Sequence, residues 1–289
     1  MASAHLLYLA CGTRDVAVQA LYAAYSALAY KGPLDLAVHI SISTDQPQIF
    51  QPLADQIHLH ELTPEKVQAL RGPGNYPYRL KIAALAELAS ELSDQRILFA
   101  DSDTFFFADL PSLFQRIDAR NAVLHRKEYS VPQNQTRQLE RFRERMGKFR
   151  FRGNAIDLSG DMWNSGAIGL HPSQFHLLTT ILAFIDAISP QYKKQLVEQY
   201  AVSYYLQKNA QLHSCDDFIF HYWSQKREYQ QVIEARLERW RSMPLEAALE
   251  ELRQKRIVLP PFAPRHGLLR RLSDRIFGSD EELAVKGPD

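Results

Sequence analysis

The chain has 289 residues, 46% of them hydrophobic and 23% charged, values that are typical of a folded globular protein. Its net charge of +1 argues against a nucleic-acid partner, and its length suits one large α/β domain with a helical appendage. No apolar run reaches the roughly 18 residues of a membrane span, and no basic segment leads into a secretory signal. The two cysteines, Cys11 and Cys215, form no Cys-x-x-Cys pair. We therefore expect a cytoplasmic protein with reduced thiols.

The first hundred residues alternate between short apolar runs and segments with helical spacing. This alternation predicts an α/β fold with a mostly parallel central sheet and helices on both of its faces. In such sheets ligands bind beyond the carboxyl ends of the strands, here near 10–15, 44–45 and 101–103. The predicted elements are strands at 5–10, 34–42, 56–62 and 96–100 and helices at 16–30 and 78–92.

A basic segment follows, with nine Lys or Arg residues against three Glu between 126 and 152. We treat residues 126–157 as an insertion. One interpretation is a mobile cover over an acceptor that carries phosphate or carboxylate, and the other is a solvated helix and loop. The elements predicted after it are helices at 173–188 and 194–208, a strand at 216–223, and helices at 226–241 and 244–256.

The C-terminal part ends in a basic amphipathic stretch. We expect a catalytic domain over 1–235 and a helical appendage over 236–289, with a proline-rich linker at 260–264. Residues 265–278 place leucines, Ile276 and Phe277 at helical spacing between arginines. Such a helix lies either in an anionic membrane interface, which would make the protein peripheral on the inner face of the membrane, or against its own domain.

The tripeptide Asp101-Ser102-Asp103 directly follows the predicted strand at 96–100. Two carboxylates on a tight turn can hold Mg²⁺ or Mn²⁺ from one side, and the open positions of the ion can bridge a diphosphate. The cation would neutralise the charge of a departing nucleoside diphosphate. The plainer alternative is an Asp-rich turn without a ligand.

Several blocks together resemble the GT-A nucleotide-sugar glycosyltransferases, above all glycosyltransferase family 8, which includes galactosyl- and glucosyltransferases and glycogenin-like proteins. The resemblance spans roughly residues 5–226. The matching blocks are Tyr78-Arg79-Leu80, the strand that ends in Asp101-Ser102-Asp103, the segment Met162–Leu170 with Asn164-Ser165-Gly166, Thr44-Asp45, Glu198-Gln199 and His221.

This resemblance implies a GT-A (Rossmann-like) fold with a C-terminal helical extension. It also implies a metal-dependent enzyme that moves a hexose from a nucleotide-diphosphate sugar, with UDP favoured, to an acceptor hydroxyl with retention of configuration. The acceptor would be a glycan, a lipid-linked molecule or a protein. Asp101, Asp103 and His221 would ligate the metal, and a histidine beside two carboxylates favours Mn²⁺ over Mg²⁺. The alternative for His221 is a half-buried strand histidine.

The resemblance also assigns the donor-binding residues. Arg79 would pair with the diphosphate, since its guanidinium fork matches phosphate oxygens. Lys226 would contact the leaving phosphate, although the family's His-x-x-Gly-x-x-Lys pattern here lacks the glycine and is one residue short. A solvated helix position is the alternative for Lys226. The turn Asp101-Ser102-Asp103 would hold the donor through the metal, and Ala10 and Thr13 would cradle the base.

The donor sugar would lie beside Asn164-Ser165-Gly166, where the glycine permits close approach of the backbone. The alternative for this block is an ordinary turn. Asn164, Glu198 and Gln199 would be the catalytic residues, the last two on the far side of the anomeric carbon. The family typically has Asp-Gln, so Glu198 departs from the pattern and could be a solvated helix residue.

Two other classes of function remain to be compared. A phosphatase of the haloacid dehalogenase type would use Asp101 as its nucleophile, but that class expects Thr or Val two residues after the second Asp, where this chain has Phe105. A non-catalytic nucleotide-sugar-binding protein on the same fold is the third class.

Overall fold

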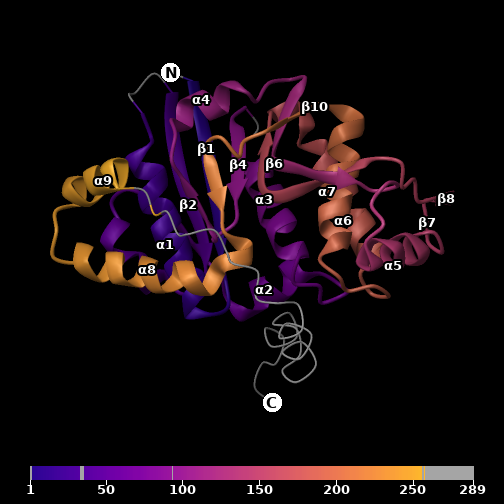
Figure 1. Cartoon of the computed structure of the whole chain (residues 1–289), viewed down its shortest axis with the longest axis horizontal. Helices are drawn as coiled ribbons and strands as arrows, with labels where there is room; N and C mark the ends of the chain where they lie inside the picture. Colours follow the sequence, from indigo (N-terminus) through magenta and orange to yellow (C-terminus); the bar gives the residue numbers. More distant parts are fainter. Residues whose placement is uncertain (1, 33–35, 93, 256, 258–289) are drawn as a thin grey trace, which may run out of the picture. The chain divides into compact units, whose positions relative to one another are not determined.

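The computed structural model describes residues 2–32, 36–92, 94–255 and 257. At its centre lies a seven-stranded sheet with the order β10-β6-β9-β4-β1-β2-β3 (Figure 1). The strands of this sheet are β1 (Ala2–Ala10), β2 (Leu36–Thr44), β3 (His58–Glu61), β4 (Arg96–Ala100), β6 (Asn121–Ser130), β9 (Asp161–Leu170) and β10 (Gln211–Ser214).

Six of the seven strands run in the same direction, and β9 is antiparallel to both of its neighbours, β4 and β6. The predicted α/β architecture with a mostly parallel sheet flanked by helices is therefore confirmed. Each parallel connection needs a crossover, and helices supply most of these crossovers. The carboxyl ends of β1, β2 and β4 consequently meet at one edge of the sheet, near Ala10, Thr44 and Ala100.

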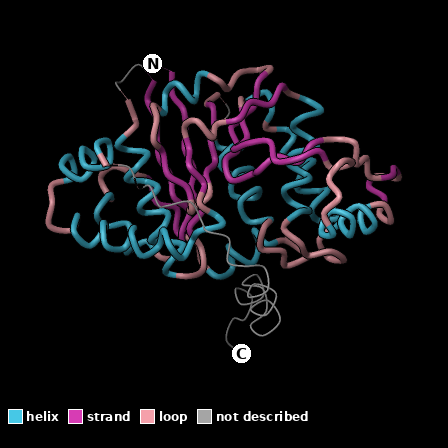
Figure 2. The backbone as a smooth tube through the Cα atoms, viewed as in Figure 1, coloured by secondary structure: helices cyan, strands magenta, loops and turns pink. Residues whose placement is uncertain are grey.

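Helices cover both faces of the sheet (Figure 2). On one face α1 packs against β1 and β2, and the Tyr8 hydroxyl donates to the Ala23 carbonyl of α1 at 3.2 Å. Helices α8 and α9 pack on α1. On the other face α3 contacts β1 and β4, while α7 contacts β9. The helices are α1 (Arg14–Ala29), α2 (Pro64–Arg71), α3 (Arg79–Glu91), α4 (Leu110–Gln115), α5 (Arg137–Met146), α6 (His176–Ile188), α7 (Leu196–Asn209), α8 (Lys226–Trp240) and α9 (Leu245–Gln254).

Two small sheets complete the fold. β5 (Thr104–Phe106) pairs antiparallel with β11 (Ile219–His221), and β7 (Arg150–Phe151) pairs with β8 (Asn154–Ala155). The strand predicted at 216–223 is thus shorter than expected, because Asp216 and Asp217 form a turn before it. After this turn, β11 pairs with β5, which directly follows the Asp101-Ser102-Asp103 tripeptide.

The basic segment predicted as an insertion begins inside the sheet, since residues 126–130 are the second half of β6. Its helix α5 turns an apolar stripe inward, and Leu139, Phe142 and Met146 are buried in the main core. Three of the four arginines of this helix are exposed, and Arg143 is half-buried, with its guanidinium donating to the Val131 carbonyl at 2.8 Å. The helix is therefore packed like the rest of the domain.

The C-terminal helices belong to the same compact unit as the sheet, Met1–Arg256. The domain boundary expected between 235 and 236 falls inside α8. The linker at 260–264 and the amphipathic stretch at 265–278 lie outside the described residues. Among the residues that the structure describes, none of the helices has the length and apolar character needed to cross a membrane.

Replacing Phe142 tests whether α5 is part of the core. Its side chain is fully buried, so Phe142→Ala should lower the free energy of unfolding by about 3–5 kcal/mol in urea denaturation. The adjacent exposed Arg141→Ala is the matched control and should cost less than about 0.5 kcal/mol. Equal losses for the two variants would mean that α5 is not packed on the core.

Candidate active site

The Asp101-Ser102-Asp103 turn is held in place from two sides. The Asp101 backbone N–H donates to the Gly166 carbonyl of β9 at 2.8 Å, which continues the β4–β9 pairing by one residue. The Thr104 hydroxyl donates to the Asp101 carbonyl at 2.7 Å and closes the turn. The two aspartates therefore lie at the carboxyl edge of the sheet, where the fold class predicts a ligand.

His221 reaches these aspartates through the β5–β11 pairing. It lies in register with Thr104, and the Tyr222 N–H donates to the Asp103 carbonyl at 3.1 Å. His221 Nε2 is 3.3 Å from Asp103 Oδ2 and 3.9 Å from Asp101 Oδ2. One ligand atom from each of the three side chains lies within 4.8 Å of the others. The predicted trio of metal ligands is thus brought together.

Gly166 makes room for this histidine. A Cβ atom at position 166 would overlap the His221 ring, so only glycine permits the approach of β11. The Asn164 Oδ1 atom accepts from the Gly166 N–H at 2.9 Å and lies 3.0 Å from His221 Nδ1. The Asn164-Ser165-Gly166 block is therefore part of a buried strand, and the interpretation of these residues as a turn is wrong.

Glu128 of β6 orients Asn164, and sequence reasoning did not single it out. Its carboxylate accepts from Asn164 Nδ2 at 3.0 Å and from Gln199 Nε2 at 2.7 Å. Since the Asn164 NH₂ group is used there, its oxygen faces His221 Nδ1, which then donates a proton to that oxygen. His221 Nε2 is left facing two carboxylates.

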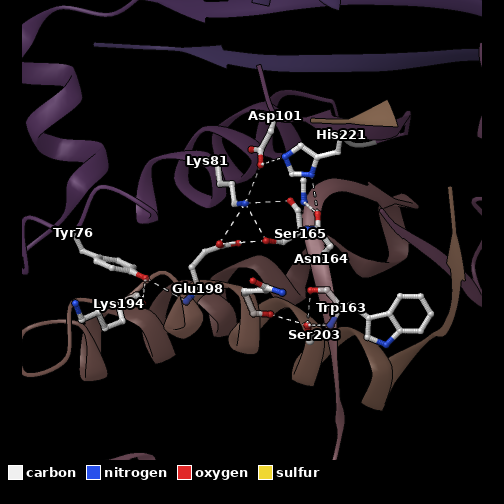
Figure 3. A network of polar contacts seen from close by, with 12 residues as sticks. Tyr76, Lys81, Asp101, Trp163, Asn164, Ser165, Lys194, Glu198, Ser203 and His221 are labelled. Atoms are coloured by element: carbon white, nitrogen blue, oxygen red, sulfur yellow. Dashed lines mark hydrogen bonds and ion pairs between the residues drawn. The ribbon is translucent and has the colours of Figure 1, made fainter. Parts of the chain in front are cut away.

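Lys81 of α3 lies at the centre of a second, buried network (Figure 3), and it too was missed by the sequence prediction. Its Nζ atom donates to the Ser165 carbonyl at 3.1 Å and to the Ser165 hydroxyl at 3.0 Å. It lies 3.3 Å from Glu198 Oε2 and 3.7 Å from Asp101 Oδ2. Burial opposes the charged form, but Asp101 and Glu198 outweigh it and raise the pKa of Lys81.

Glu198 is fully buried, so the alternative of a solvated helix residue is wrong. It accepts from the Ser165 hydroxyl at 3.3 Å, while its Oε1 atom has no hydrogen-bond partner among the described residues. Burial raises the pKa of Glu198 to about 7, against the opposing pull of Lys81. The next residue, Gln199, is also buried and is held by Glu128.

Lys226 points back to the metal ligands. Its Nζ atom is 3.0 Å from Asp103 Oδ2, although the residue begins α8 and its side chain is half exposed. Burial alone would raise the pKa of Asp103, but His221 and Lys226 hold it below its usual range. The shorter spacing from His221 does not keep this lysine out of the site.

Arg79 is engaged elsewhere in the structure. Its guanidinium forms a two-point pair with Asp186 of α6, with Nε at 2.6 Å from Oδ1 and Nη2 at 3.0 Å from Oδ2. Its Nη1 atom donates to the Leu70 carbonyl at 2.7 Å. The contacts described for Arg79 do not include Asp101, Asp103 or His221, so its predicted pairing with a diphosphate would need this pair to open.

The loop predicted to bind the base lies at the end of β1. Ala10 is in register with Thr44, and the Asp45 carboxylate accepts from the Gly12 N–H at 3.0 Å. Gly12 has φ +111°, a backbone conformation that favours glycine. The Thr13 hydroxyl caps α1 by accepting from the Val16 N–H at 3.4 Å.

The donor set of Asp101, Asp103 and His221 fits a divalent cation. Two carboxylates and one imidazole are hard to borderline ligands, and Nε2 of His221 faces both carboxylates. Its other nitrogen is fixed by Asn164, which is the usual arrangement of a metal-bound histidine.

Comparisons with known proteins find likeness among solved structures. No protein-family model matches the chain, and no curated protein matches its sequence. Mouse xyloside xylosyltransferase 1 in its apo form is similar with a TM-score of 0.49 and 15% sequence identity. The alignment covers 81% of this chain and 93% of that one.

The buried carboxyl of Glu198 should make stability depend on pH. Its folded-state pKa of about 7 exceeds the ordinary 4.5, so protonation favours the folded state, and the contribution of Glu198 to stability falls as pH rises from 4.5 to 7. Over that window the loss should be about 3 kcal/mol, and Glu198→Gln should lack it. Urea unfolding at several pH values in the presence of EDTA measures the difference. The exposed Glu91→Gln should keep the wild-type profile, and a wild-type-like pH slope in Glu198→Gln would refute the prediction.

The chain from Glu128 through Asn164 to His221 should affect metal binding. Glu128→Ala frees the Asn164 amide to turn, so we expect Mn²⁺ affinity to fall about 10-fold, as measured by electron paramagnetic resonance titration. The neighbouring exposed Lys127→Ala, which loses only its pair with Asp161, should bind Mn²⁺ as the wild type does. Unchanged affinity in Glu128→Ala would show that Asn164 keeps its orientation without Glu128.

Proposed function

We propose that the protein is a divalent-metal-dependent glycosyltransferase of the GT-A type, which moves a hexose from a nucleotide-diphosphate sugar to an acceptor hydroxyl. The observation that carries this proposal is the convergence of Asp101, Asp103 and His221 next to the Asn164-Ser165-Gly166 strand and the buried Glu198. The family 8 resemblance supports it, because these are the blocks that carry the resemblance.

Asp101, Asp103 and His221 would hold Mn²⁺ or Mg²⁺, with Mn²⁺ favoured by the histidine. The cation, when bound, would neutralise the charge of the departing diphosphate. Lys226 would also stabilise the negative charge of the departing diphosphate. Its Nζ atom already lies at Asp103, and its half-exposed side chain can extend to a phosphate oxygen that enters the site.

The donor sugar would lie along β9. Asn164 and Ser165 are the polar residues of that segment, and Lys81 holds Ser165 in place with two hydrogen bonds. Glu198 and Gln199 lie on α7 beside this strand, and one Glu198 oxygen has no hydrogen-bond partner in the part of the chain that the structure describes. A carboxylate so placed can stabilise positive charge that develops on the anomeric carbon. Retention of configuration is carried over from the family resemblance.

The partners are proposed by class. The donor is a nucleotide-diphosphate sugar, with UDP favoured by the resemblance, and the loop with Ala10 and Thr13 would receive its base. The acceptor is a glycan, a lipid-linked molecule or a protein. A cytoplasmic location, together with binding to an anionic membrane through residues 265–278, also remains a proposal.

Hydrolysis of nucleotide sugars with Mn²⁺ tests this function. Purified protein should slowly release nucleoside diphosphate from one donor, and Asp103→Asn should reduce that rate about 100-fold or more, because a buried charge at the cation is lost. Asp217→Asn is a matched control, since this exposed aspartate pairs with Arg116 near β11 and should leave the rate unchanged.

Three other outcomes distinguish the alternatives. Hydrolysis of phosphate monoesters that depends on Asp101 would favour the phosphatase. Binding of a donor without turnover with any acceptor would favour a non-catalytic nucleotide-sugar-binding protein. If no donor is bound or hydrolysed with any divalent metal, the glycosyltransferase proposal fails.

A further inference from the structure

His125 of β6 is a buried histidine close to the candidate metal ligands. Its side chain is 4% exposed, and it does not belong to the cluster of Asp101, Asp103 and His221. The contacts of Lys81 do not include it either. A buried polar side chain in a native protein usually has a partner or a function, and the contacts of His125 indicate both.

The register of β6 against β9 changes at His125. The residues on either side of it pair with Ile168 and with Asn164, so this one residue of β6 stands opposite three residues of β9, 165–167. The middle one is Gly166, where a Cβ atom would overlap the imidazole of the third candidate ligand. Strand irregularities re-aim side chains and are common beside functional sites.

Two hydrogen bonds tie His125 to the segment that carries His221. Its Nε2 atom donates to the Ile219 carbonyl at 3.2 Å, and its own backbone carbonyl accepts from the Cys215 N–H at 3.0 Å. Ile219 is the first residue of β11, and His221 is the last. Because a carbonyl only accepts, the proton of the His125 ring lies on Nε2. One residue of β6 therefore holds β11 with both its side chain and its backbone.

The ring of His125 also meets the ring of His221. Their centroids are 5.3 Å apart and their planes cross at 87°, the edge-to-face arrangement that aromatic rings favour. At Nδ1 the His221 ring is held by Asn164 Oδ1 at 3.0 Å. The imidazole is thus fixed by a hydrogen bond at one nitrogen, by the His125 ring and by the backbone at Gly166, and its Nε2 atom faces the two aspartates.

This arrangement leaves one atom of His125 without a partner. Its Nδ1 atom is buried and has no hydrogen bond among the described residues. An unpaired buried polar atom is costly, and an aliphatic side chain at this position would avoid the cost. Such a side chain would offer neither an aromatic ring to His221 nor an N–H donor to β11.

We propose that His125 is a positioning residue of the metal site, whose ring fixes the His221 imidazole so that Nε2 points at Asp101 and Asp103 before a cation arrives. This inference rests on the proposed metal-dependent function, but it concerns affinity for the cation and not turnover. An imidazole that is already oriented loses less freedom on binding. Loss of a group that orients a metal-bound histidine typically weakens metal binding roughly 10–100-fold.

Mn²⁺ titration of the full chain without a nucleotide sugar, followed by electron paramagnetic resonance, tests this role. Asp103→Asn should abolish the tight binding of the wild type and so identifies the site. His125→Ala should weaken Mn²⁺ binding at least about 10-fold. The matched control is His213→Ala on the neighbouring strand β10, which loses a contact with Asn121 and should bind Mn²⁺ as the wild type does.

Two conservative replacements separate the ring contact from the hydrogen bond. His125→Phe keeps an aromatic ring for His221 and loses the N–H donor, so its Mn²⁺ affinity should stay within about 3-fold of the wild type. His125→Gln keeps a donor for the Ile219 carbonyl and loses the ring, so it should bind as weakly as His125→Ala. Urea unfolding in EDTA measures the stability of each variant, and the comparison of Phe with Gln decides the question if the Ala variant does not fold.

Three outcomes would overturn the proposal. Stability that falls in His125→Ala without a loss of affinity would mean that this residue supports only the fold. Rescue of Mn²⁺ binding by Gln and not by Phe would mean that the hydrogen bond to β11 sets His221. Failure of the wild type to bind Mn²⁺ would remove the metal-dependent function together with this inference, whereas the first two outcomes leave that function standing.

Discussion

The candidate site depends on one reversed strand. β9 runs antiparallel between β4 and β6, so its polar residues pass the point where the parallel strand β4 ends. The hydrogen bond from the Asp101 N–H to the Gly166 carbonyl fixes the position of the Asp101 turn against β9. A parallel strand in the same place would meet β4 in another register, and Asn164 and Ser165 would not face the aspartates.

The close contact of β9 with its neighbours also explains why the site needs a glycine at position 166. β11 approaches from the other side of the Asp101 turn and brings His221 against the β9 backbone. The space that a Cβ at Gly166 would fill is occupied by the imidazole. One residue without a side chain therefore lets three segments that are distant in sequence meet at the candidate cation site.

Charge balance constrains the buried part of the site. Lys81 and Glu198 are both buried, and an isolated charge of either kind would be costly there. Lys81 keeps its charge because Asp101 and Glu198 face it, while Glu198 is pushed toward its neutral form by burial and by Asp101. Asp101 thus lies between the lysine and the other two candidate metal ligands, Asp103 and His221. A cation there would compete with Lys81 for the same carboxylate, which couples metal binding to the Glu198 network.

Much of this arrangement was predictable from the sequence, and the parts that were not have physical reasons. The strands at 5–10 and 96–100 are short apolar runs, and the Asp pair marks the end of the second, so the sheet edge and the place of the Asp pair on it could be predicted. β9 could not be distinguished from a turn by periodicity, because Asn164-Ser165-Gly166 interrupts its apolar pattern. β6 was hidden by Arg126 and Lys127, whose charges fit a surface insertion.

The two missed site residues illustrate what sequence can and cannot reveal. Lys81 stands within the run Leu80–Leu85, all of which is buried, and a lone lysine in so apolar a helix is a signal that could have been used. Glu128 carries no such signal, because an acidic residue among basic ones suggests a surface salt bridge. The Glu128 carboxylate lies beside Asn164 only because of the register of β6 against β9. That register shifts between Leu124 and Arg126 and again between Lys127 and Tyr129. Strand irregularities of this kind re-aim side chains at functional sites, and they depend on pairing that no local sequence pattern records.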